Sequence, residues 1–159
     1  MKFPVVIGSN LLRRKITLPD DLQGDLNIIF IAFQRWQQSQ VDSWLPEARR
    51  LEKVYPGVRY YELPTIYQMN VISKTFLNEG MRAGIPNQTA RDRTITLYLN
   101  KIPFRRALGI ANEDEITVML LNREGEVLWR ETGVHTAEKA ERLIHMILEA
   151  SPAAGEPES

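Results

Sequence analysis

An unbroken apolar run near the start of the chain constrains the fold more than any other feature. Residues 26–33 read LNIIFIAF, and only Asn27 interrupts eight residues of mostly β-branched, aliphatic and aromatic character. A strand with one solvent-facing side alternates apolar and polar residues, whereas a continuous run is typical of a strand covered on both faces. The run therefore predicts the central strand of a parallel or mixed sheet.

The segments after this run alternate between helix and strand patterns. Residues 41–54 carry apolar side chains at three- and four-residue steps, and Pro46 should bend the helix that this spacing predicts. A strand is predicted over 58–63, ending at Pro64, and a second helix over 66–83. The buried stripe of the first helix should consist of Val41, Trp44, Leu45, Ala48, Leu51 and Val54.

The second half of the chain continues this alternation. A strand is predicted over 94–99, a short helix over 103–108, and a hairpin around the glycine-containing turn at 122–125. A last helix follows Thr136, which is a good N-cap residue. Its buried side should contain Ala140, Leu143, Ile144, Ile147 and Leu148.

This order of elements predicts one domain. Strands and helices alternate over residues 1–150, which indicates an α/β fold with a mixed central sheet and helices on both faces. Residues 151–159 are rich in Pro, Ala and Glu, and we expect them to form a flexible C-terminal tail.

The composition excludes several classes of partner. The 159 residues contain equal numbers of basic and acidic side chains, so the formal net charge is zero. Such a chain has no long-range attraction for nucleic acid or anionic membranes, and its weak colloidal repulsion leaves room for a homodimer. Its longest apolar run is far shorter than the roughly 20 residues of a membrane-spanning helix, and its N-terminus lacks a signal-peptide pattern. We expect a cytoplasmic protein that binds another protein.

The absence of cysteine removes thiol chemistry. Without cysteine the chain has no thiolate nucleophile, no disulfide and no cysteine-ligated metal. Its two histidines, His135 and His145, are ten residues apart, a spacing that does not match paired metal ligands on a helix or turn. We predict no metal site and no bound cofactor.

Three segments resemble the thioredoxin-like superfamily, in particular its peroxiredoxin and redoxin branch. Residues 16–30 look like the opening of those domains, with a short strand and a glycine turn before the central strand. Residues 96–110 are similar to their next strand and short helix, and residues 118–128 resemble their hairpin. The resemblance implies a thioredoxin-like three-layer sandwich.

The resemblance also implies where redox chemistry would be found. Members of the superfamily carry their cysteines at the N-terminus of the helix after the central strand, where the helix dipole lowers the thiol pKa. Gln38 and Val41 occupy the two cysteine positions here, and Ile116 occupies the position of the characteristic cis-proline. Neither an amide nor an aliphatic group can be oxidised or attack a disulfide, so thiol oxidoreductase and peroxidase activities are excluded.

A second resemblance covers the last third of the chain. Residues 94–99, 104–110 and 125–130 look similar to the C-terminal part of the mitochondrial ATP synthase assembly factor family. This resemblance implies action by protein contact, as a chaperone.

Our first functional hypothesis is a non-catalytic protein-interaction or assembly module that uses the former active-site face. Trp36 would anchor a partner if it is exposed, and the alternative is that it packs under the first helix. Ser39 is better explained as a helix N-cap than as a nucleophile. The candidate contact residues are Trp36, Gln37, Gln38, Ser39, Gln40 and Glu115, with the backbone edge at Glu115-Ile116 available to an extended peptide.

The second hypothesis is a thiol-independent small-anion-binding protein or enzyme. Positive charge concentrates between residues 82 and 106, and the alternative is a solvated face. The anion-binding residues would be Arg91, Arg93, Arg105 and Arg106. Three adjacent acids, Glu113-Asp114-Glu115, are expected to form a solvated loop.

Overall fold

The structure, a computed structural model, describes residues 1–67 and 93–150 and is built on one seven-stranded sheet. Its elements are, in chain order, β1 (Val6–Asn10), β2 (Lys15–Leu18), β3 (Leu26–Ala32), the 3-10 turn η1 (Arg35–Gln37), α1 (Gln38–Val54), β4 (Val58–Tyr67), β5 (Ile95–Leu99), α4 (Lys101–Leu108), β6 (Thr117–Asn122), β7 (Val127–Thr132) and α5 (Ala137–Ala150). The strands follow the order β2-β1-β5-β4-β3-β6-β7. The pairs β3–β4 and β4–β5 are parallel and the remaining pairs are antiparallel, so the sheet is mixed, as predicted.

β3 is the central strand that the apolar run predicts. It pairs in parallel with β4 on one side and antiparallel with β6 on the other. Every side chain from Leu26 to Ile31 is buried, because alternate residues face the helices on opposite sides of the sheet. This double coverage explains why the run has almost no polar interruption.

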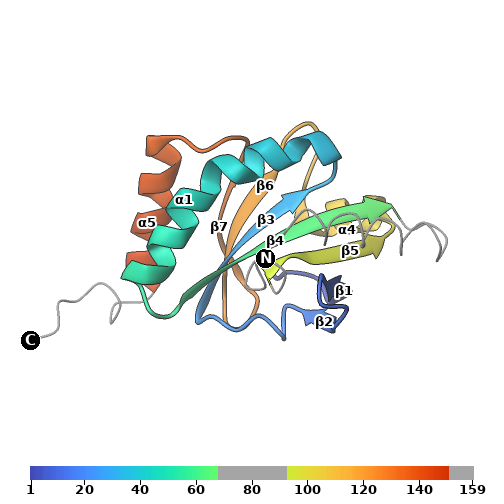
Figure 1. The fold of residues 1–159 in the computed structure, drawn as a ribbon, viewed down its shortest axis with the longest axis horizontal. Coiled ribbons are helices and arrows are strands. Elements are labelled where there is room, and N and C mark those ends of the chain that lie inside the picture. Colours follow the sequence, from blue (N-terminus) through green and yellow to red (C-terminus); the bar gives the residue numbers. More distant parts are fainter. Residues whose placement is uncertain (68–92, 151–159) are drawn as a thin grey trace, which may run out of the picture.

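Helices cover both faces of the sheet. Figure 1 shows α1 and α5 side by side over one face, with α4 on the opposite face. On the α1 side, the ring centroids of Phe30 and Trp44 are 6.1 Å apart. On the α4 side, Phe104 lies 5.8 Å from Phe3 and 6.5 Å from Phe33. Each face of the sheet therefore has its own apolar cluster, which confirms the predicted three-layer α/β sandwich.

The two long helices bury the stripes that their spacing predicts, except at their ends. In α1 the buried side chains are Val41, Trp44, Ala48 and Leu51, and the helix continues through Pro46. The indole N–H of Trp44 donates a hydrogen bond of 2.9 Å to the Gly133 carbonyl. Leu45 and Ile144 are half-buried and pack against the same apolar cluster, whereas Val54 and Leu148 are exposed.

β4 is longer than the sequence predicts. The strand continues through Pro64 to Tyr67, so Ile66 lies in a strand and not in a helix. Pro64 stands opposite Ala32, the last residue of β3, and the N–H that proline lacks is therefore not needed for further pairing with β3. Beyond Pro64 the strand pairs with β5. The rest of the helix predicted over 66–83 lies outside the described residues.

The second half of the chain follows the predicted order. α4 begins two residues before Pro103, because the Asn100 side chain caps it by accepting the Ile102 N–H at 3.1 Å. Gly109 ends the helix with a φ of 66°, and Gly125 turns the β6–β7 hairpin with a φ of 82°, so both glycines adopt the conformation that favours them. No helix of the described part of the chain is long and apolar enough to cross a membrane.

Candidate functional site

The turn between β3 and α1 is organised by the side chain of Gln37, which is fully buried. Its Oε1 accepts the backbone N–H of Phe33 at 2.9 Å and that of Gln34 at 3.2 Å. Its Nε2 donates to the backbone carbonyl of Glu113. An amide supplies both an acceptor and donors, so one side chain can satisfy groups on two separate segments. Gln37 is therefore unavailable to a partner, and its prediction as a contact residue is wrong.

Glu113 connects this turn to α4. Its carboxylate accepts hydrogen bonds from Gln34 Nε2 at 2.8 Å, Lys101 Nζ at 3.1 Å and Arg105 Nη1 at 3.2 Å. The expectation of a wholly solvated acidic loop is wrong for Glu113, whose side chain is only 21% exposed. One signal in the sequence could have found this cluster, because Lys101 and Arg105 are four residues apart and share one helix face.

The tip of α1 carries Gln38 as its first residue. The exposed amide of Gln38 donates to Asp42 Oδ1 at 2.9 Å and to Glu62 Oε1 at 3.0 Å. Val41 is buried against the sheet. The positions that the thioredoxin resemblance assigns to two cysteines thus hold an amide between two carboxyl groups and an aliphatic core residue.

Burial changes the titration of Glu62 on β4. Removal from water raises the pKa of this carboxyl above its ordinary value of 4.5, and the negative charge of Asp42 adds to the increase. The hydrogen bond from Gln38 and the charge of Arg49 lower the pKa, but by less than burial raises it.

The backbone in front of β6 is already hydrogen-bonded within the protein. The Ile116 N–H donates to Gln40 Oε1 at 2.9 Å, and the Ile116 carbonyl accepts the Gly133 N–H at 3.1 Å. The single cis peptide bond in residues 1–67 and 93–150 precedes Pro19, not Ile116. An extended peptide therefore cannot pair with the backbone of Ile116, which corrects the expected edge at Glu115-Ile116.

Three of the predicted contact residues remain accessible at the start of α1. Trp36 is 58% exposed, so the alternative that it packs under the helix is wrong. Gln38 and Ser39 are also exposed. Ser39 is not the N-cap of α1, because the helix begins at Gln38 and Gln37 is the N-cap residue. The Ser39 hydroxyl instead donates to the Trp36 carbonyl at 3.2 Å.

Glu115 lies apart from these residues and lines a hollow beside the start of β6. The hollow has a volume of about 280 Å³ and lies between residues 109–112 and the adjoining ends of β6 and β7. Arg130 is one of the residues that line the hollow, and its Nη1 donates to the Leu108 carbonyl at 2.6 Å. Glu115 itself is exposed.

The predicted arginine site is not gathered in one place. Arg93 is bound by both carboxylate oxygens of Glu52 on α1, and its guanidinium lies 4.5 Å from the ring centre of Tyr60. Arg105 is bound to Glu113 beyond the other end of β5, and Arg106 is exposed on α4. Arg91 lies outside the described residues.

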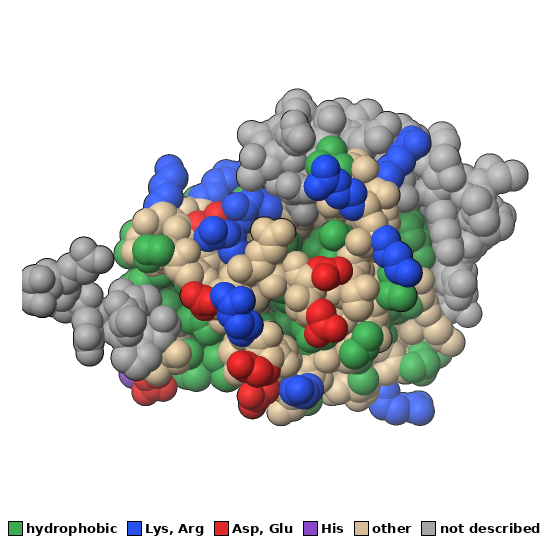
Figure 2. All heavy atoms as spheres, turned by 90° about the horizontal axis from the view of Figure 1, so that it is seen from below, with side chains coloured by type: hydrophobic (Ala, Val, Ile, Leu, Met, Phe, Trp, Pro, Cys, Tyr) green, Lys and Arg blue, Asp and Glu red, His purple; other side chains and the backbone are tan. Residues whose placement is uncertain are grey.

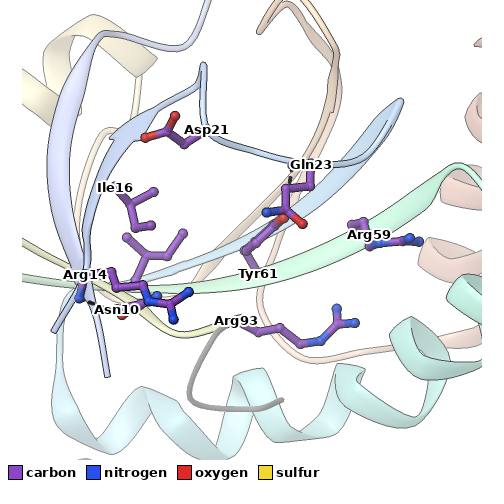
Figure 3. Close-up of a pocket in the computed structure, with 9 residues that line it drawn as sticks. Asn10, Arg14, Ile16, Asp21, Gln23, Arg59, Tyr61 and Arg93 are labelled. Carbon is purple, nitrogen blue, oxygen red and sulfur yellow. Dashed lines mark hydrogen bonds between the residues drawn. The ribbon is translucent and has the colours of Figure 1, made fainter. Parts of the chain in front are cut away.

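Arg93 also borders a hollow of about 190 Å³ between the β1–β2 hairpin and β4 (Figure 3). The lining consists of Asn10, Arg14, Ile16, Asp21, Gln23, Arg59, Tyr61, Arg93 and Ile95. Figure 3 shows the side chains of Arg59 and Arg93 extending to one side of the hollow, with Arg14 on the other. Because the guanidinium groups do not converge, the hollow does not form the concentrated anion site that the sequence predicts.

The face of the molecule that Figure 2 shows carries charges of both signs. Figure 2 shows acidic and basic side chains interspersed there, with apolar side chains between them. In the described part of the chain, no three His, Cys, Asp or Glu side chains gather in a way that could hold a metal ion.

Solved structures similar to this chain share the thioredoxin-like fold. BsSco, a member of the Sco family of cytochrome c oxidase assembly proteins, is 12% identical, with a TM-score of 0.63 and coverage of 95% of this chain and 94% of BsSco. The exposed lipoprotein thioredoxin Etrx1 of Streptococcus pneumoniae is 12% identical, with a TM-score of 0.57 and coverage of 92% and 99%. The thioredoxin domain of a thiol-disulfide oxidoreductase from Bacteroides vulgatus is 11% identical, with a TM-score of 0.56 and coverage of 92% and 95%. Fold and site together define a thioredoxin-like domain without thiols.

The sequence model of the family described as ATP10 protein matches residues 1–149, so the chain belongs to this family. The likeness to an ATP synthase assembly factor therefore covers nearly the whole chain and is not limited to its last third. No curated protein sequence matches the chain.

The burial of Gln37 predicts a large loss of stability on its removal. Gln37→Ala should lower the free energy of unfolding by about 2–4 kcal/mol, because it leaves buried backbone groups on two segments without partners. Gln38→Ala, at an exposed amide one residue later, should cost less than about 1 kcal/mol. Urea unfolding followed by circular dichroism measures both, and equal losses would contradict the structural role of Gln37.

The raised pKa of Glu62 predicts a pH-dependent penalty. Because the folded protein holds this proton more tightly than the unfolded chain, the contribution of Glu62 to stability falls as the pH rises from about 4.5 through its folded pKa. Glu62→Gln should therefore gain stability relative to the natural protein between pH 4 and pH 7. Urea unfolding across that range tests this, with the exposed Glu141→Gln as the control for the loss of one charge. A gain in stability that does not depend on pH would show that burial does not raise the pKa of Glu62.

Proposed function

We propose that this protein is a non-catalytic assembly module that binds a protein partner through a docking face formed by Trp36, Gln38 and Ser39. The observation that carries the proposal is the exposure of Trp36 on a turn whose backbone is fixed by buried hydrogen bonds. At an interface, tryptophan contributes more binding energy than most residues.

The rigidity of the turn favours binding. Ordering a loop on association opposes affinity, and a turn that is already held by Gln37 and Glu113 avoids most of that cost. Trp36 is thus presented in one position, as an anchor should be.

The site chemistry supports contact and not turnover. The helix tip that would lower a thiol pKa holds Gln38, whose amide is neither a nucleophile nor a redox group. Membership in the ATP10 family, a family of ATP synthase assembly factors, agrees with a role in which the chain binds a protein during assembly. BsSco, which has a similar fold, is also described as a member of a family of assembly proteins.

Photocrosslinking tests the docking face directly. The photoreactive amino acid p-benzoylphenylalanine replaces Trp36 in the full chain, in cells that produce the protein naturally. The control carries it in place of Val54, which is 51% exposed at the opposite end of α1. We expect a discrete crosslinked protein from position 36 and none from position 54, and we expect Trp36→Ala to reduce co-purification of that protein at least about tenfold.

Two results would contradict the proposal. One is crosslinking to the same protein from both positions, and the other is undiminished co-purification with Trp36→Ala. Circular dichroism of each variant verifies the fold, and Trp36 is exposed enough for its replacement to be tolerated.

A further inference from the structure

The topology brings α4 to the same edge of the sheet as the proposed docking face. β3 and β5 both run parallel to β4, so their carboxyl ends lie at one edge. η1 follows β3 and α4 follows β5. Lys101 at the start of α4 donates to the Phe33 carbonyl at 3.3 Å, and Glu113 bonds to both segments. The turn that carries Trp36 and the first turn of α4 are therefore neighbours.

A second large apolar side chain is exposed at this edge. Ile102, in the first turn of α4, is 59% exposed, which is as much as Trp36 at 58%. Both belong to segments held by buried or partly buried hydrogen bonds, from the Phe33 N–H to Gln37 and from Lys101 to Glu113. Exposed apolar side chains that gather on neighbouring segments are typical of a contact surface.

Positive charge flanks both apolar side chains. Arg35 precedes Trp36, and Arg106 lies one helical turn after Ile102 on the same side of α4. The carboxylate of Glu113 is already shared between Lys101 and Arg105. Within residues 1–67 and 93–150, no carboxylate pairs with Arg35 or Arg106. The surface therefore combines apolar contact area with two cations available to an acidic partner.

We propose that Arg35, Trp36, Ile102 and Arg106, the Trp36–Ile102 surface, bind an acidic segment of a protein partner that inserts apolar side chains between the two arginines. This inference rests on the proposed function and specifies the chemistry of the partner at the same face. A second copy of the chain fits less well, because a two-fold contact places the same surface against itself and brings like charges together.

The test uses a fluorescein-labelled synthetic peptide of Glu and Leu, with three control peptides in which Ser replaces Leu, Gln replaces Glu, or Lys replaces Glu. Fluorescence anisotropy with the full-length protein should show binding of the Glu/Leu peptide at least about tenfold tighter than of any control. Binding should weaken as the salt concentration rises, because exposed charges are screened.

Matched variants locate the binding surface. Trp36→Ala and Ile102→Ala should each weaken binding of the Glu/Leu peptide about tenfold, and Arg35→Gln and Arg106→Gln severalfold. The controls are Val54→Ala, at another exposed apolar residue, and Arg14→Gln, at an exposed arginine on the β1–β2 hairpin; both should leave binding unchanged.

Several results would overturn the inference. Equal binding of the Ser-containing peptide would show that the arginines attract anions without apolar contact. Equal weakening by Val54→Ala or Arg14→Gln would place binding elsewhere, and sedimentation showing a dimer lost in Ile102→Ala would make a second copy the occupant. If the Glu/Leu peptide fails to bind but position 36 still crosslinks a partner, the inference about chemistry fails and the proposed function stands. If position 36 yields no partner either, both fail.

Discussion

The edge of the sheet at which β3 and β5 end depends on one buried side-chain amide, that of Gln37. Gln37 accepts two backbone N–H groups from the turn after β3 and donates to the carbonyl of Glu113, so a single side chain joins two separate chain segments. The carboxylate of Glu113 then secures Lys101 and Arg105 on α4. Without Gln37 the turn would hold unsatisfied polar groups inside the protein, and Trp36 would have no fixed position.

Glutamine side chains occupy the region where related folds hold redox chemistry. Gln37 supports the turn, Gln38 lies between Asp42 and Glu62 at the helix tip, and Gln40 binds the backbone in front of β6. Each of these amides forms at least one hydrogen bond that a thiol could form only weakly. This thioredoxin-like domain thus has a network of amide hydrogen bonds at the start of α1, and that network stabilises structure instead of transferring electrons.

Most of the fold follows from local patterns in the sequence. The doubly covered β3, the buried stripe of α1 and the glycines that end α4 and turn the hairpin are all visible in residue spacing, because each reflects a local period or conformation. The extension of β4 beyond Pro64 is not visible in residue spacing, because it depends on where the neighbouring strand β3 ends.

The site was only partly predictable for a similar reason. Position along the chain located Gln38 and Trp36, but nothing local shows that Gln37 points inward while its neighbours point outward. The partnership of Glu113 with Gln34 spans 79 residues, and adjacent acids in a sequence usually indicate a solvated loop. The arginines are close in number, which predicts one cluster, yet β5 separates Arg93 from Arg105 and each of the two binds a different carboxylate.

Amide hydrogen exchange followed by NMR tests the role of Gln37 most directly. The account predicts slow exchange at the N–H groups of Phe33 and Gln34, which lie outside the sheet, and rapid exchange at both in Gln37→Ala, while the amides of β3 stay protected under native conditions. Rapid exchange of Phe33 and Gln34 in the natural protein, or unchanged protection in Gln37→Ala, would contradict it.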